Sequence, residues 1–340
     1  ATIRSDAARI VGLAARHVPP PETVITAIGK KCVDEDVSVA NAAADTLAVV
    51  ATSRPVEAAR ALAVDDIRAL DAAVRCLQTM PATDAFDEHC RSLISLATSD
   101  ADPLGQLAAL ELVGGLGERL GPAVPALVDV ARSDDPFHAG DHALSALARL
   151  PADALPDEFF DLVLARFNHR DDVVVGLDVL GRVAAAPAGL DRVFARPRLA
   201  DAWFSKENDD SSTVRGARLA SWAKATMTDA LWRRLDHRAI LRDLRKTYDP
   251  DVRDAAARLA ARAVAGPTTA LADLVALDGF YSWLVAVDPQ LPAPAARAKF
   301  DVLAAAAAKT PSPLNAPTRA HLGRLRDLGP FRRPDAGRDG

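Results

Sequence analysis

The stretch DPDVRDAAARLAARAVAG, residues 249–266, holds the pattern that decides the fold. An Asp-Pro pair opens it, Val252 follows, and small or apolar residues recur at Ala256 and Leu259. Spacings of four and seven residues put these side chains on one face of an α-helix. Asp249 can cap the first free amides of that helix, and the proline after it suits a first turn because it lacks an N–H. The stretch therefore predicts a capped helix with one apolar face.

The same pattern recurs along the chain at steps of about 35 to 39 residues, or about twice that. Related segments are 2–14, 34–51, 64–77 (the weakest match), 100–117, 133–150, 171–185 and 209–225. Other helical segments alternate with them, at 123–133, 157–168 and 237–248. Because one antiparallel helix pair cannot bury its own apolar face, such units must stack. We therefore predict an all-α, right-handed superhelix of roughly eight two-helix units over residues 1–266. A non-repetitive, alanine-rich helical bundle is the alternative.

Composition narrows the class of protein. The chain is 49% hydrophobic and 26% charged, which argues against a disordered or fibrous chain. Its net charge of −5 does not supply the basic field that nucleic-acid binding usually needs. Apolar runs are short, so no membrane span is expected. Three cysteines without a CxxC pair favour a reducing compartment, the cytoplasm, over a disulfide framework.

Several repeat helices open with a Val-Arg or Ile-Arg pair, which follows an aspartate-containing turn in two of the three cases. The pairs are Val252-Arg253, Val214-Arg215 and Ile3-Arg4. This arrangement resembles HEAT and armadillo repeats, and the resemblance covers the chain to about residue 266. It implies an α-solenoid and leaves the function open, because such arrays serve as adaptors, transport receptors, cytoskeletal binders and assembly chaperones.

The region after the array has a different pattern. Residues 267–329 are predicted to form capping helices, including 294–309 and 316–329, and residues 330–340 a flexible tail. Asp278-Gly279-Phe280, Trp283-Leu284 and the run Lys299–Leu303 resemble the C-terminal region of the 26S proteasome non-ATPase regulatory subunit 5 family. The segments 102–117 and 177–195 also look like that family's repeats. The resemblance implies a chaperone for assembly of the proteasome base, which binds the C-terminal domain of an ATPase subunit.

Aromatic side chains cluster in LDGFYSWLV, residues 277–285, although the whole chain has only ten Phe, four Trp and two Tyr. The cluster comes where the repeats stop, and terminal units of an array are atypical because they cap its core. In a helix that starts after the Asp-Gly turn, Phe280, Trp283 and Leu284 share one face. We expect those three in the core and Tyr281 pointing away, where it could contact a partner.

Motifs that would carry chemistry are absent from the sequence. It has no GxGxxG after a strand, no GxxxxGK[ST], no GxSxG and no HExxH. In HAGDH, His138 and His142 lie four residues apart beside Asp141, a spacing that can serve a zinc site or can simply be structural. Acidic pairs recur in the repeat turns, where helix capping explains them better than acid–base catalysis. We therefore expect no enzyme, no cofactor and no metal.

Partner contacts are the remaining function class. In a solenoid one helix of each unit lines the concave surface, and later helices of this chain are rich in basic residues. The candidate contact residues are Arg215, Arg218, Trp222, Lys224, Asp254, Arg258, Arg262 and Tyr281. Trp222 is either an exposed anchor or the filling of a gap between repeats. We expect a monomer that binds a protein and binds neither nucleic acid nor membrane. The partner that the family resemblance implies is the C-terminal domain of a proteasome ATPase subunit. A generic HEAT-repeat adaptor or scaffold is the alternative.

Overall fold

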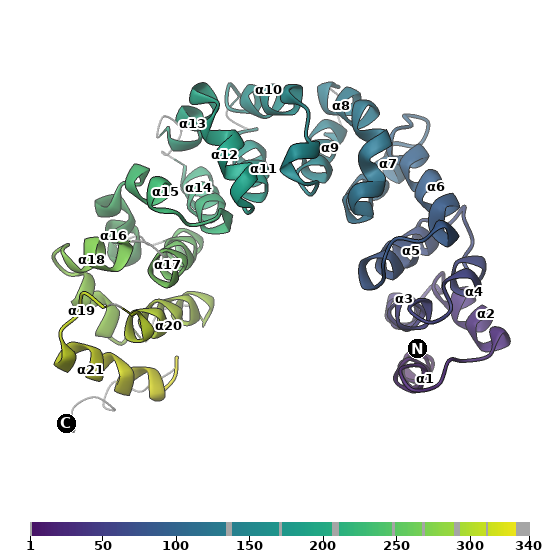
Figure 1. The fold of residues 1–340 in the computed structure, drawn as a ribbon, viewed down its shortest axis with the longest axis horizontal. Helices are drawn as coiled ribbons and strands as arrows, with labels where there is room; N and C mark the ends of the chain where they lie inside the picture. Colours follow the sequence, from purple (N-terminus) through teal and green to yellow (C-terminus); the bar gives the residue numbers. More distant parts are fainter. Residues whose placement is uncertain are drawn as a thin grey trace. The chain divides into compact units, whose positions relative to one another are not determined.

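A computed structural model describes residues 2–133, 138–169, 172–205, 211–246, 249–266, 269–288, 293–310 and 312–330. These residues form helices that follow one another along the chain, and no strand occurs among them (Figure 1). The predicted all-α repeat fold is confirmed. The chain divides into two compact units, residues 1–162 and 163–340. Residues 331–340 of the predicted tail lie outside the described residues.

Unit 1 stacks its helices in two layers. The first layer contains α1 (Thr2–Ala15), α3 (Val37–Ala51), α5 (Ile67–Thr79), α7 (Pro103–Val113) and α9 (Ala139–Leu147). Each of these packs on the next. Against them lie α2 (Glu22–Lys31), α4 (Pro55–Arg60), α6 (Asp87–Ala97) and α8 (Val124–Arg132), and α10 (Asp157–Arg166) follows α9. Short 3₁₀ turns lie at Asp84–Phe86, Gly114–Ala123 and Ala152–Ala154.

Unit 2 repeats this arrangement. Its first layer contains α11 (Val173–Val183), α14 (Ser212–Lys224), α17 (Pro250–Ala265) and α20 (Ala293–Ala308), again packed in that order. The other helices are α12 (Pro187–Phe194), α13 (Pro197–Phe204), α15 (Asp229–Arg234), α16 (His237–Lys246), α18 (Ala270–Val275), α19 (Phe280–Val285) and α21 (Ala316–Asp327), the last packed on α20. Each repeat segment found in the sequence supplies a first-layer helix. We call all first-layer helices, including α20, the repeat helices.

Aspartates cap many of the repeat helices, as their spacing predicts. The side chains of Asp36, Asp66, Asp102 and Asp249 accept hydrogen bonds from backbone amides at the starts of α3, α5, α7 and α17. Asp172 precedes α11 without such a bond. At α9 the capping position is held by His138, in a left-handed conformation with φ of 58°. The capping signal is therefore strong but not universal.

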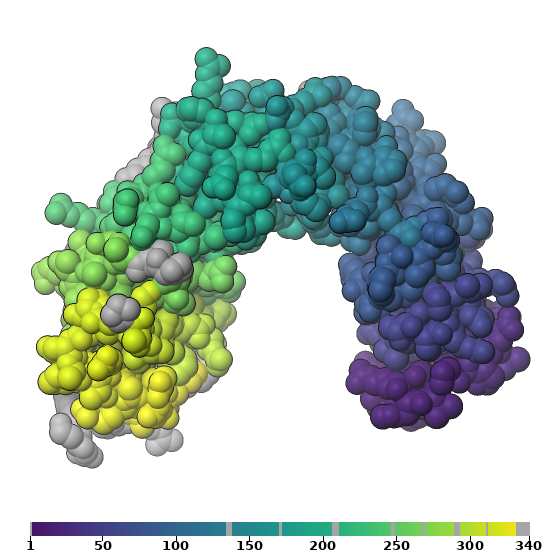
Figure 2. All heavy atoms as spheres, viewed as in Figure 1, coloured from purple at the N-terminus to yellow at the C-terminus, as the bar shows by residue number. Residues whose placement is uncertain are grey.

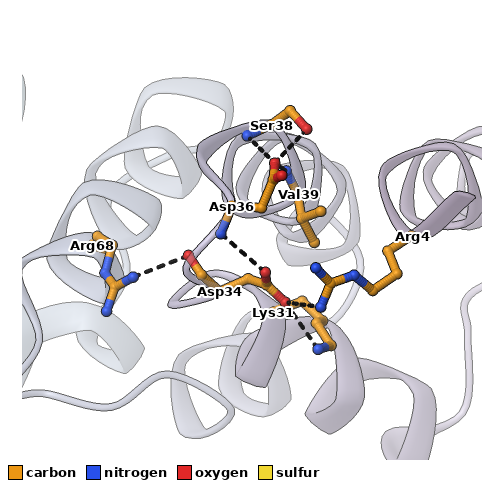
Figure 3. A network of polar contacts seen from close by, with 7 residues as sticks. All are labelled: Arg4, Lys31, Asp34, Asp36, Ser38, Val39 and Arg68. Carbon is orange, nitrogen blue, oxygen red and sulfur yellow. Dashed lines mark hydrogen bonds and ion pairs between the residues drawn. The ribbon is translucent and has the colours of Figure 1, made fainter. Parts of the chain in front are cut away.

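A single turn ties several helices of unit 1 together (Figure 3). The carboxylate of Asp34, between α2 and α3, accepts hydrogen bonds from Lys31 Nζ at 2.9 Å and from Arg4 Nη1, in α1, at 3.1 Å. It also accepts one from the backbone N–H of Asp36 at 3.1 Å, which shapes the turn that caps α3. Arg68 of α5 donates to the backbone carbonyl of Asp34 at 3.0 Å. The turn at Asp34 thus links the successive repeat helices α1, α3 and α5.

Small side chains let the repeat helices pack closely. Ala43 in α3 and Ala256 in α17 are fully buried, with many neighbouring alanines also in the core. Side chains fill the space between neighbouring helices within each unit (Figure 2). The three cysteines are buried and unpaired, and burial raises the pKa of Cys32 and of Cys76 to about 12. None of the described helices is long and apolar enough to cross a membrane.

The aromatic stretch forms the short helix α19 and packs much as expected. Phe280 and Leu284 are buried in the core. Trp283 is only half-buried, a correction to the prediction, because its ring faces the ammonium of Lys299 at 5.2 Å instead of entering the core. Lys299 is itself buried and donates to the carbonyl of Ala286 at 2.7 Å. The motifs around residues 280 and 299 therefore join α19 to α20.

Candidate partner-binding groove

A groove of about 490 Å³ lies on the repeat helices of unit 2. It is lined from three neighbouring helices by Ala220, Ala223 and Lys224 of α14, by Arg258, Ala261, Arg262 and Ala265 of α17, and by Asp301 and Ala305 of α20. The three helices are adjacent because α17 packs on both α14 and α20. The lining therefore combines alanine methyl groups with four charged side chains.

The local sequence of α17 explains how both kinds of side chain reach the groove. At 100° per residue, Arg258 and Arg262 follow one edge of a helix face, and Ala261 and Ala265 follow the adjacent edge. The opposite face carries buried residues such as Ala256 and Leu259, which pack in the core. Because alanine projects little beyond the backbone, the groove stays open between longer charged side chains.

Charges in and beside the groove are mostly paired. Lys224 forms an ion pair with Asp178 of α11, whose carboxylate also accepts a hydrogen bond from Arg182 at 2.7 Å. Burial alone would raise the pKa of Asp178, but these two partners outweigh it and the pKa is lowered. Arg258 lies 2.8 Å from Asp254, one turn earlier on the same helix.

Two further charged side chains complete the lining. Asp301 lies 3.7 Å from Arg297, also on its own helix. Arg262 is exposed and forms no ion pair with any residue that the structure describes. The groove thus presents one cation without an ion-pair partner in the described part of the chain, and its cations and its anion arise from different helices.

The structure divides the predicted contact residues into three groups. Lys224, Arg258 and Arg262 line the groove, and Asp254 lies beside it as the partner of Arg258. Tyr281 is 37% exposed on α19 and is not among the groove-lining residues. The other three, on α14, are buried or half-buried.

Two of these three α14 residues are buried, and the third is half-buried. Trp222 is 7% exposed and stacks on Phe204 with ring centroids 5.7 Å apart, so it fills a gap between helices and is no exposed anchor. Arg218 is buried and donates to the carbonyl of Trp203 at 2.9 Å. Arg215 is largely covered and is held by a two-point ion pair with Asp243 of α16.

Sequence reasoning misses the groove's alanines and Asp301 as candidate site residues. On a helical wheel of α14 or α17, the groove alanines recur with the same period as the buried residues. They form a second face of small residues on each helix. That pattern alone does not separate a tightly packed face from an open one. Asp301 stands out in the sequence only as part of a family motif, and its place in the groove depends on the packing of α20 against α17.

The histidine pair in HAGDH has no third potential metal ligand grouped with it among the described residues. His138 holds the N-cap position of α9 without a side-chain hydrogen bond to the helix; its side chain is mostly exposed, and its Nδ1 lies 3.6 Å from the Asp141 carboxylate. Within the described ranges, no three His, Cys, Asp or Glu side chains come together in a way that could hold a metal ion.

Comparisons with known proteins give little further guidance. No protein-family model matches the chain, and no curated protein matches it significantly. Among solved structures, similarity is found to engineered proteins of the Northeast Structural Genomics Consortium. One is 20% identical with a TM-score of 0.46, covering 96% of this chain and 80% of that one. A second is 20% identical with a TM-score of 0.25 and coverage of 83% and 97%. At these TM-scores the likeness adds no argument, and the fold rests on the helix packing described above.

Proposed function

We propose that the chain is a non-catalytic protein-binding scaffold whose contact surface includes the groove of α14, α17 and α20. The observation that carries this proposal is the groove itself, where alanine methyl groups and charged side chains from three repeat helices meet. Alanine offers neither a nucleophile nor an acid or base, and among the described residues no histidine or hydroxyl is oriented on the charged lining residues in the way that catalysis needs. Recognition is the activity that such a lining supports best.

In its finer form, the proposal makes the chain an assembly chaperone for the base of the 26S proteasome. Support comes from the motifs around Phe280 and Lys299, which resemble the regulatory subunit 5 family and which join α19 to α20. The partner would then be the C-terminal domain of one base ATPase, bound in the cytoplasm by a monomeric chain. A general HEAT-repeat adaptor has the same fold and the same kind of surface, so the partner decides between the two.

A binding experiment with a groove-filling variant tests both forms. The purified chain is titrated against each base ATPase C-terminal domain, with Ala265→Trp as the groove variant and Ala230→Trp as its control. Both alanines are exposed, and residue 230 lies in α15, away from the groove. The chaperone form predicts micromolar or tighter binding to one domain, weakened by the first substitution alone. Absence of binding to every domain contradicts the chaperone form, and equal binding by both variants contradicts the groove.

A further inference from the structure

We propose that the partner segment received by this groove is an α-helix that carries carboxylates along one edge. The inference rests on the proposed function, because it names the class of partner for the same groove. It follows from three properties of the lining: what it can hydrogen-bond, how closely it lets a backbone approach, and where its charges lie.

Hydrogen bonding favours a helix over an extended peptide. The floor residues Ala220, Ala223, Ala261, Ala265 and Ala305 have no polar side-chain atoms, and their backbone N–H groups lie past the first turns of α14, α17 and α20, where they donate within the helix. Only the carbonyls in the last turns, such as those of Ala223 and Ala265, could accept from a partner, so an extended peptide laid on this floor would leave most of its own N–H and C=O groups without protein partners there. A helix satisfies its backbone groups internally and brings only side chains to the surface.

The small side chains of the groove floor allow a partner helix to approach closely. Helices pack with axes about 8 to 10 Å apart, and the shorter distances need small side chains at the contact. Alanines on three successive repeat helices leave room for side chains of a partner helix to lie between the longer Lys224, Arg258 and Arg262. The partner helix therefore buries apolar side chains against methyl groups.

Charge favours an acidic edge on that helix. Arg258 and Arg262 lie one turn apart on α17, so they match carboxylates spaced one turn apart on a partner. Arg262 has no ion-pair partner among the described residues, and the Arg258 side chain is 63% exposed where it pairs with the half-buried Asp254, so its guanidinium stays accessible to a partner carboxylate. Asp301 on α20 repels an acidic edge, which places that edge toward α14 and α17.

Synthetic peptides test this partner class without knowledge of the natural partner. The first is a helical peptide of about 18 residues, roughly five turns, with alanine and leucine on one face and glutamates one turn apart along one edge. The second has lysine at each glutamate position, and the third contains a central proline that breaks the helix. Fluorescence anisotropy measures their binding to the full chain and to two variants. Arg262→Glu alters the groove, and Arg198→Glu makes the same charge change at an exposed arginine of α13.

The proposal predicts that the glutamate peptide binds the wild-type chain at least tenfold more tightly than the lysine or proline peptide. Arg262→Glu should weaken that binding about tenfold, and Arg198→Glu should change it less than twofold. Equal binding of the glutamate and lysine peptides, equal binding of the proline peptide, or equal effects of the two substitutions would overturn the inference. These results do not bear on whether Ala265→Trp blocks a folded protein partner, so failure here is distinct from failure of the proposed function.

Discussion

The guanidinium of Arg253, near the start of α17, lies 2.7 Å from the carboxylate of Asp288, in the segment before α20. The same relationship joins Arg4 of α1 to Asp34 before α3, and Arg215 of α14 to Asp243 before α17. Each arginine belongs to one of the Val-Arg or Ile-Arg pairs of the sequence. Each reaches an aspartate that lies shortly before the next repeat helix. The pairs therefore connect each of these repeats to the one that follows it.

Removal of the Arg253–Asp288 pair should lower the stability of unit 2. The Arg253 side chain is 20% exposed and that of Asp288 37%, so we expect a coupling free energy of about 1 kcal/mol, near the upper end for partly exposed pairs. A double-mutant cycle with Arg253→Ala and Asp288→Ala, followed by urea unfolding, measures it. The Arg297–Asp301 pair on α20 is longer and more exposed and serves as the control, with coupling expected near zero. Equal coupling in both cycles would contradict a connecting role.

Two buried tryptophans should respond differently to replacement by phenylalanine. Trp203 Nε1 donates to Ser221 Oγ at 2.9 Å, whereas the buried Nε1 of Trp222 has no partner among the described residues. Both substitutions remove the same volume, but only Trp203→Phe removes a buried hydrogen bond. We expect Trp203→Phe to destabilise by about 1 to 2 kcal/mol more than Trp222→Phe, measured by urea unfolding. The reverse order would show that the Trp222 ring does not lie as described.

Gly279 should not tolerate a side chain. Its φ is 88°, a left-handed conformation that side chains disfavour, and an added Cβ would also meet the guanidinium of Arg245, whose Nη1 donates to the Asp278 carbonyl at 3.3 Å. Gly279→Ala should therefore destabilise by about 1 to 3 kcal/mol. Gly323, inside α21, has open space around the same position, so Gly323→Ala should stabilise by up to about 1 kcal/mol. Thermal unfolding of the two variants checks both signs, and a neutral Gly279→Ala would contradict the turn geometry.

Acid should weaken the repeat turns. Hydrogen bonds to the aspartate side chains, chiefly from Lys31, Ser38, Arg68 and Ser212, lower the pKa values of Asp34, Asp36, Asp66 and Asp249. A carboxyl with a lower pKa in the folded state contributes stability above its unfolded pKa, and that contribution is lost as pH falls through the folded pKa. Urea midpoints should therefore change little from about pH 7 to about pH 5 and fall below about pH 4. Asp36→Asn should reduce the size of that fall, and an unchanged profile would count against the capping role.

The buried thiols should be unreactive in the folded chain. Because burial raises the pKa of Cys32 and Cys76 to about 12, almost none of either thiol is ionised at neutral pH. Labelling with a disulfide reagent should be slow without denaturant and should reach all three cysteines once urea unfolds the chain. Rapid labelling of the native chain would show that the core around α3 and α5 opens readily.

The repeat helices are the most predictable part of the molecule. A helical period of apolar residues, renewed at a constant step, depends only on local spacing and on the need to bury one face. Asp249 and Val252 thus locate the start of α17 from the sequence alone. The pairing of Arg253 with an aspartate before the next repeat is not predictable in this way, because it depends on how one repeat packs on another.

The site is less predictable for the same reason. Trp222 is buried because Phe204, from a neighbouring helix, covers its ring, and no spacing within α14 reveals this. Arg218 is buried because a backbone carbonyl of α13 accepts its hydrogen bond. Conversely, Ala261 and Ala265 look like core positions in the sequence, yet they line a groove because the neighbouring helices also present alanine there. Exposure of a repeat-helix face is decided by its neighbours in space.

Photo-crosslinking inside the cells that make the protein tests the central claim, that the groove of α14, α17 and α20 binds a protein. A photoreactive amino acid is placed at Ala265, in the groove, or at Ala230, on α15, and the same chains are prepared with Arg262→Glu. We predict a discrete crosslinked protein from position 265 that is absent from position 230 and greatly reduced by Arg262→Glu. The same crosslinks from both positions, or none from position 265, would contradict it.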